Sequence, residues 1–147
     1  MITLLIAALL SGQDYNDPAN RCANPMNGLD VSACMEMLLD AGTARMNVYL
    51  AAASGTLAGR KSESGRDFAA ALAESQTQWE AHADAACGLV RDASGYAEQG
   101  CRIELTQERT LHLWTYFLVP EDGPALLDQP EPIMVEAPPE EAGEAEE

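Results

Sequence analysis

The stretch SGRDFAAALAESQTQWEAHADAACGLV, residues 64–90, contains the most regular pattern in this chain. Seven mostly apolar residues recur in this stretch at steps of three and four, and this spacing places them on one face of an α-helix. They are Phe68, Leu72, Ser75, Trp79, Ala83, Ala86 and Val90. Ser64, with Asp67 three residues later, is typical of a helix N-terminus, where side-chain oxygens accept hydrogen bonds from free amides. We therefore predict a helix that begins at Ser64.

A helix on each side of this stretch completes the predicted fold. The preceding one begins near Asn27, with Asp30 in the matching cap position, and ends near Gly55 and Gly59. Its apolar face consists of Leu38, Gly42, Met46, Tyr49, Ala53 and Leu57. The following helix runs from about Glu98 to Phe117, and Pro120 ends it. Its apolar residues are Leu105, Leu113, Trp114 and Phe117. We predict an all-α fold, a small antiparallel bundle of about three helices.

Composition indicates that such a bundle needs an added constraint. Aromatic residues make up only 5% of the chain, and much of the hydrophobic fraction is alanine, which buries little area. The chain contains four cysteines, Cys22, Cys34, Cys87 and Cys101, and none forms the CxxC pair typical of zinc sites. We predict two disulfides formed in an oxidising compartment. The predicted helices place Cys34, Cys87 and Cys101 at one end of the bundle, which favours the pairs Cys34–Cys87 and Cys22–Cys101. The alternative pairing, Cys22–Cys34 with Cys87–Cys101, remains possible because sequence alone cannot fix disulfide connectivity.

The two ends of the chain differ from the middle. Residues 1–12 contain the apolar run ITLLIAALL, which fits a signal peptide and is too short to span a bilayer; a buried strand or helical turn is the alternative. Residues 21–119 form the predicted helical domain. Residues 120–147 contain ten acidic residues, no basic ones and several prolines, which predicts a disordered acidic tail. No other apolar run is long enough to anchor the protein stably in a membrane.

Charge limits the partners that this chain can bind. Between Arg21 and Val119 there are 12 acidic and 8 basic residues, a net charge of −4. Because no basic stripe is present to neutralise phosphates, we do not expect nucleic acid as a partner. A basic protein partner is compatible with this charge.

Several short fragments together resemble the LprI-like family of lysozyme inhibitors. They are the four cysteines with Met46-Asn47-x-Tyr49, Leu72-x-x-Ser75-Gln76-x-x-Trp79, Asp84-x-x-Cys87, Gly100-Cys101-Arg102 and Leu105-Thr106-x-x-Arg109. They span about ninety residues in order. Ala83 stands where the family usually has arginine. The resemblance implies a helical, periplasmic or secreted bacterial domain, of which some relatives inhibit animal-type lysozyme.

The polar and aromatic residues of these fragments are the first candidate functional residues. They are Asn47, Tyr49, Gln76, Trp79, Asp84, Thr106 and Arg109. We interpret Asn47, Gln76, Thr106 and Arg109 as a hydrogen-bond set between helices, with Trp79 filling the core.

The connection RDASGYAEQ, residues 91–99, is the second candidate, because Cys87 and Cys101 flank it and hold its ends. It offers Arg91, Asp92, Ser94 and Tyr96 as contacts for a partner. Glu80, His82 and Asp84 are spaced for different sides of a helix, so we predict no metal site. We also predict no catalytic residues and no cofactor.

Two functions fit these observations. The first is a binding protein, not an enzyme, that inhibits a basic animal-type lysozyme. The second is an interaction or scaffold module of the bacterial envelope that binds another envelope protein and has no effect on lysozyme.

Overall fold

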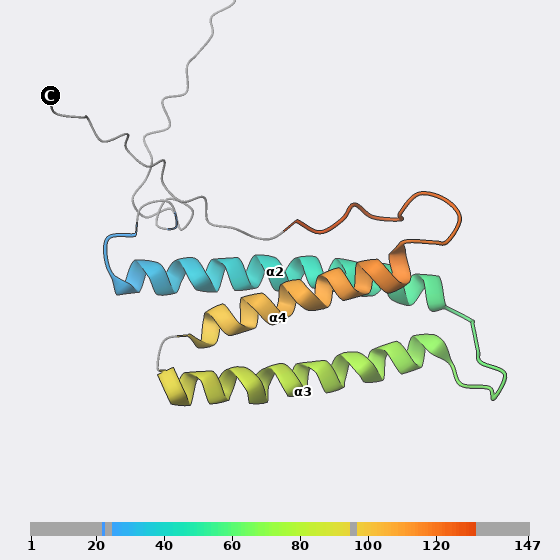
Figure 1. The fold of residues 1–147 in the computed structure, drawn as a ribbon, viewed down its shortest axis with the longest axis horizontal. Helices are drawn as coiled ribbons and strands as arrows, with labels where there is room; N and C mark the ends of the chain where they lie inside the picture. Colours follow the sequence, from blue (N-terminus) through green and yellow to red (C-terminus); the bar gives the residue numbers. More distant parts are fainter. Residues whose placement is uncertain (1–21, 23–24, 95–96, 132–147) are drawn as a thin grey trace, which may run out of the picture. The chain divides into compact units, whose positions relative to one another are not determined.

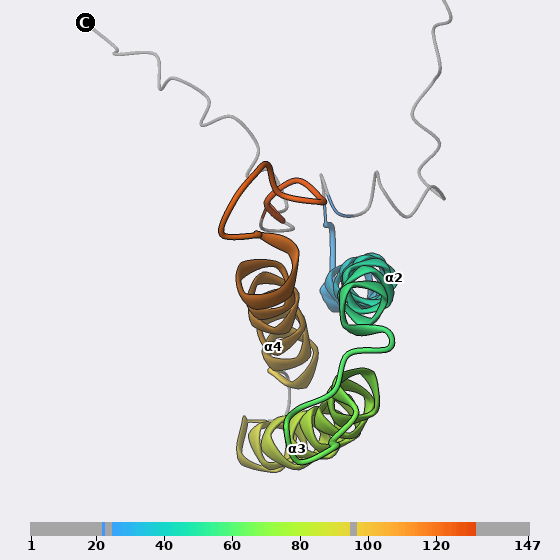
Figure 2. The same ribbon diagram turned by 90° about the vertical axis from the view of Figure 1, so that its right-hand side faces the viewer.

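The computed structural model describes residues 22, 25–94 and 97–131 and has the predicted all-α architecture. Helix α2 spans Gly28–Leu57, α3 spans Phe68–Ser94 and α4 spans Glu98–Leu113. A π-helical turn, η1 (Trp114–Leu118), continues α4. Helix α3 runs antiparallel to both α2 and α4 (Figure 1), and an end-on view shows the three helices at the corners of a triangle (Figure 2). From Met35 onward, the helices belong to one compact unit, Met35–Met134.

The predicted start of the first helix is confirmed. Asn27 Oδ1 accepts hydrogen bonds from the backbone N–H groups of Leu29 (2.9 Å) and Asp30 (3.1 Å). Asp30 Oδ2 accepts a hydrogen bond from the Met26 N–H at 3.0 Å, so the two side chains cap the first turn together. At the other end, Gly59 has a φ of 72°, which only glycine adopts without strain.

The predicted start of the second helix at Ser64 is wrong by four residues. Helix α3 begins at Phe68, and Asp67 itself caps it, because Asp67 Oδ1 accepts a hydrogen bond from the Ala70 N–H at 2.9 Å. Ser64 lies instead in a tight turn. Gly65 has a φ of 82° there, and Ser62 Oγ accepts a hydrogen bond from the Arg66 N–H. The positive φ of Gly65 is incompatible with a helix, so α3 starts only after this turn.

The core is small and comes from all three helices and η1. Its buried residues are Met46, Tyr49, Ala53, Leu57, Leu72, Leu113 and Leu118. The predicted face of α2 is therefore correct. On α3 the predicted residues Leu72 and Ala83 are buried, but Gln76 and Cys87 are buried as well, whereas Ser75 is exposed. Trp79 is only half-buried against the edge of the core, so it is not the central residue that we predicted.

Two disulfides are present, but with the pairing that we did not favour. Cys22 is bonded to Cys34, and Cys87 is bonded to Cys101, with 12 and 14 residues of sequence separation. Both bridges are local. Helices α3 and α4 are joined by a very short connection, so their adjoining turns face each other and bring Cys87 close to Cys101, with Cα atoms 5.6 Å apart.

Within residues 119–131, the segment from Leu126 to Glu131 contacts the bundle, whereas we predicted disorder from residue 120. The Tyr49 hydroxyl donates a hydrogen bond to the carbonyl oxygen of Asp128 (2.7 Å), and Trp114 Nε1 donates one to that of Leu127 (2.9 Å). Leu127 also packs against the core. These donors stand on α2 and η1, so this C-terminal strap connects two elements of the bundle (Figure 1). The predicted signal peptide and the acidic residues after 131 lie outside the described part of the chain.

Candidate functional site

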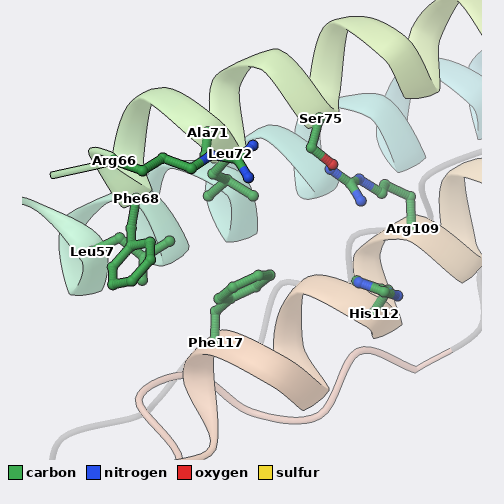
Figure 3. Close-up of a pocket in the computed structure, with 9 residues that line it drawn as sticks. All are labelled: Leu57, Arg66, Phe68, Ala71, Leu72, Ser75, Arg109, His112 and Phe117. Atoms are coloured by element: carbon green, nitrogen blue, oxygen red, sulfur yellow. The ribbon is translucent and has the colours of Figure 1, made fainter. Parts of the chain in front are cut away.

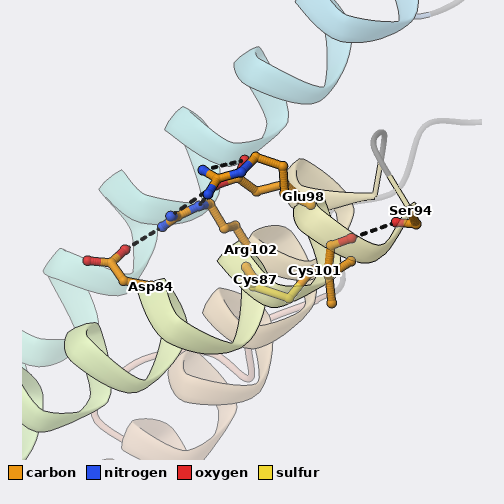
Figure 4. Close-up of a disulfide and its surroundings, with 8 residues drawn as sticks. Asp84, Cys87, Ser94, Glu98, Cys101 and Arg102 are labelled. Atoms are coloured by element: carbon orange, nitrogen blue, oxygen red, sulfur yellow. Dashed lines mark hydrogen bonds and ion pairs between the residues drawn. A yellow bond between two sulfur atoms is a disulfide. The ribbon is translucent and has the colours of Figure 1, made fainter.

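An ion-pair cluster lies beside the Cys87–Cys101 disulfide (Figure 4). Arg102 Nη1 donates to Asp84 Oδ1 at 2.7 Å, and Arg102 Nε and Nη2 both donate to Glu98 Oε1 at 3.2 Å. The hydrogen bond that Arg102 donates to Asp84 is the largest cause of the raised pKa of Arg102. Asp84 stands three residues before Cys87 and Arg102 one residue after Cys101. The disulfide and the ion pair therefore join α3 to α4 at neighbouring turns.

The tethered connection is shorter than we predicted. Helix α3 continues through Ser94 and α4 begins at Glu98, so Arg91, Asp92 and Ser94 are helical residues. Arg91 lies 3.2 Å from Asp92 and 3.6 Å from Glu98, and the Ser94 hydroxyl donates a hydrogen bond to the Val90 carbonyl. These side chains are exposed, but each contacts a neighbouring residue of α3 or the first turn of α4. Tyr96 lies outside the described residues.

A groove between the three helices brings several candidate residues together. It encloses about 430 Å³ and is lined by Leu39, Asp40, Thr43, Met46, Asn47, Trp79, Glu80, Ala83, Asp84, Arg102 and Thr106. We call it the motif groove, because Asn47, Trp79, Asp84 and Thr106 all belong to the fragments that resemble the lysozyme-inhibitor family. It contains three carboxylates and one cation, so it is acidic.

Thr106 is the buried polar residue among those that line the motif groove. It is 5% exposed, and its backbone carbonyl accepts a hydrogen bond from the Thr110 hydroxyl at 2.7 Å. Within the described residues, Arg45 Nε is the buried side-chain polar atom that lacks a hydrogen-bond partner, so the Thr106 hydroxyl is not an unsatisfied buried group.

Two of the four residues that we interpreted as a hydrogen-bond set between helices are bonded to each other. Arg109 Nε donates to Gln76 Oε1 at 3.0 Å, which joins α4 to α3, and Gln76 Nε2 donates to Glu80 Oε1 at 3.1 Å. Asn47, by contrast, is exposed, and Thr106 lines the groove. Burial lowers the pKa of Arg109. Tyr49 bonds the strap and not another helix.

The family whose model matches this chain is the lysozyme inhibitor LprI family, over residues 20–113. The chain belongs to the LprI family. The matched range covers more than half of the chain, including both disulfides and the motif groove, and it ends at the last residue of α4. Searches of curated proteins and of solved structures found no match. The resemblance that we drew from the short fragments is therefore confirmed.

Three findings beyond the family match bear on location and chemistry. Disulfides persist in oxidising compartments, so the two bridges of this LprI-family chain indicate an extracytoplasmic location. None of the helices described is long and apolar enough to cross a membrane. In the same described residues, no group of three or more His, Cys, Asp or Glu side chains is arranged to hold a metal ion.

Sequence analysis missed two contributors to the site. In the sequence, Arg102 was noted only as part of the fragment Gly100-Cys101-Arg102. Its ion pair with Asp84 depends on the Cys87–Cys101 disulfide, which brings the two residues together. Asp40 belongs to no fragment. It stands seven residues before Asn47, two helical turns along α2, and this spacing is the signal that places both residues on one face.

Proposed function

We propose that this protein is a periplasmic or secreted inhibitor that binds a lysozyme through the motif groove. The observation that carries the proposal is the LprI family match over residues 20–113, which includes every residue of the groove. The two disulfides support an extracytoplasmic setting, where an inhibitor would meet lysozyme. The protein acts by binding, not as an enzyme.

The charge of the groove supports a basic partner. Animal-type lysozymes are basic, and complementary charge speeds the encounter of two proteins. Asp84 is already neutralised by Arg102, and Glu80 is bonded to Gln76. Asp40 has no ion pair in the part of the chain that the structure describes, so its carboxylate is available for a lysine or arginine of the partner.

The side chains that line the motif groove also favour it as the binding surface. Trp79 is half-buried at the groove and presents an aromatic surface beside polar groups. Tryptophan is enriched among the residues that dominate binding energy, especially where water is excluded around it. Thr106 adds a polar side chain to the lining of the groove.

The test is the lysis of peptidoglycan by an animal-type lysozyme, titrated with the wild-type protein and with Asn47→Arg. Asn47 is an exposed residue of α2 that lines the groove, so arginine there blocks the groove without disturbing the core. Val48→Arg is the matched control, because Val48 is 58% exposed on the same helix and does not line the groove. We expect wild type and Val48→Arg to inhibit, and Asn47→Arg to inhibit at least ten-fold less.

Other outcomes would redirect the proposal. If wild type does not inhibit, the lysozyme proposal is wrong, and the second function, an envelope interaction module, takes its place. If Asn47→Arg inhibits like wild type while Tyr96→Ala does not, the short connection between α3 and α4 is the contact. If only a protein lacking residues after Glu131 loses activity, the acidic tail accounts for the attraction.

A further inference from the structure

A second pocket lies on the other side of the Gln76–Arg109 bond, and it differs from the motif groove in charge. It encloses about 250 Å³ and is lined by Leu57, Arg66, Phe68, Ala71, Leu72, Ser75, Arg109, His112 and Phe117 (Figure 3). None of these residues is acidic, although the chain has 24 acidic and only 8 basic residues. We call it the arginine pocket.

The pocket holds a buried cation without an anionic partner. Arg109 is 8% exposed, and its hydrogen bonds go to two neutral oxygens, Gln76 Oε1 at 3.0 Å and Ser75 Oγ at 3.3 Å. Among residues 22, 25–94 and 97–131 it forms no ion pair. A buried charge without a counter-charge is costly, so a ligand anion beside the guanidinium would be stabilised.

One further cation lines this pocket, and the charge of Arg109 acts on a nearby imidazole. Arg66 is exposed, lines the pocket and has no ion-pair partner in the described part of the chain. The pKa of His112 is lowered by burial and by the charge of Arg109, which indicates that the positive potential of Arg109 reaches the imidazole. Asp67 is adjacent to Arg66 in sequence, but its carboxylate caps α3 by accepting the Ala70 N–H.

The rest of the pocket is apolar. Leu57 and Leu72 are almost fully buried, and the rings of Phe68 and Phe117 form the wall farther from Arg109 (Figure 3). An apolar cavity of about 150 Å³ admits benzene. A pocket of about 250 Å³ therefore has room for a single ring or a short hydrocarbon chain together with a carboxylate.

We infer that the arginine pocket binds a small amphipathic carboxylate, with the carboxylate at Arg109 and Arg66 and the hydrocarbon part against Phe68, Leu72 and Phe117. A guanidinium binds a carboxylate through paired, charge-assisted hydrogen bonds. The apolar wall favours a ligand with a hydrocarbon part over a bare anion. This inference does not rest on lysozyme inhibition.

The experiment is a titration of the full, oxidised protein with sodium octanoate, followed by NMR and by calorimetry. The chain has two histidines, His82 and His112. We expect the ring resonances of His112, which lines the pocket, to shift on binding, and those of His82, which does not, to stay in place. Octanol, which lacks the charge, and acetate, which lacks the chain, should each bind at least ten-fold more weakly than octanoate.

Two variants locate the site. Ala71→Leu fills the pocket from a half-buried position, and Arg66→Gln removes an exposed cation, so both leave the core intact. We expect each to weaken octanoate binding at least five-fold. Arg91→Gln is the matched control, because it removes an exposed arginine at the other end of α3, and it should bind like wild type. The inference is overturned if octanol binds as tightly as octanoate, if Ala71→Leu binds unchanged, or if octanoate leaves the His112 resonances unmoved up to its solubility.

Discussion

Removing the Cys87–Cys101 bridge with the double substitution Cys87→Ala and Cys101→Ala tests how much of the stability comes from covalent constraint. The two cysteines are 14 residues apart. By the loop-entropy relation, closing a loop of this length in the unfolded chain stabilises the native state by about 3 kcal/mol. The bridge is also fully buried at Cys87, so the lost sulfur adds a small packing cost.

This loss is large for a small domain. A free energy of unfolding of about 5–15 kcal/mol is usual for a whole domain, so the variant loses a substantial share of it. For a domain of this size, a loss of about 3 kcal/mol corresponds to a melting temperature lower by roughly 12–24 °C. The helices should still form at low temperature, because the core residues are untouched.

The assay is urea unfolding at 25 °C, followed by circular dichroism and by the fluorescence of Trp79 and Trp114. The double variant of Cys22 and Cys34 is the comparison, and its shorter separation of 12 residues predicts nearly the same entropic loss. A digest of the unreduced wild type should contain a peptide pair linked through Cys87 and Cys101. The reasoning is refuted if the Cys87 and Cys101 variant loses less than about 1 kcal/mol, or if the digest links Cys34 to Cys87.

Three further variants test other parts of the structure. Leu113→Ala empties a fully buried position of the core and should lower the free energy of unfolding by about 2–5 kcal/mol in urea titrations; a smaller loss would mean that the core collapses around the site. Tyr49→Phe removes the hydrogen bond to Asp128 and should cost about 1 kcal/mol, whereas no change would show that the strap does not depend on it. The lowered pKa of His112 means that the folded state binds this proton less readily than the unfolded state, so its contribution to stability is present above the ordinary pKa and is lost as pH falls. His112→Gln should therefore lose less stability than wild type between pH 7 and pH 5, as measured by urea unfolding at each pH, and an equal loss would contradict the assignment.

Local signals in the sequence predicted the helices well. Asn27 caps α2 as expected, and the apolar face from Gly42 to Leu57 is buried, because capping and helical periodicity act over a few residues. The start of α3 was missed because Ser64 and Asp67 both look like caps, and only the positive φ of Gly65 decides between them.

The remaining differences depend on contacts between distant residues. Gln76 is buried where its side chain accepts a hydrogen bond from Arg109 of α4, a contact between helices that periodicity alone cannot reveal. The disulfide pairing depends on how closely the C-terminal part of α3, which contains Cys87, approaches the first turn of α4, which contains Cys101. The candidate site was predicted as a loop because the glycine in RDASGYAEQ suggested a long break, yet most of its described residues are helical.

The strap of residues 119–131 is held by its backbone more than by its side chains. Tyr49, Trp114 and Arg45 donate to the carbonyl oxygens of Asp128, Leu127 and Glu131, groups that every amino acid possesses. Replacing the side chains of Asp128 or Glu131 therefore leaves these hydrogen bonds available, and proline itself would keep the acceptors. Position 126 is different, because the Leu126 N–H donates to the Leu118 carbonyl at 2.8 Å and proline has no such donor. Asp128 and Glu131 can therefore change in side chain and in charge while the strap keeps these contacts, whereas Leu127, which packs against the core, cannot.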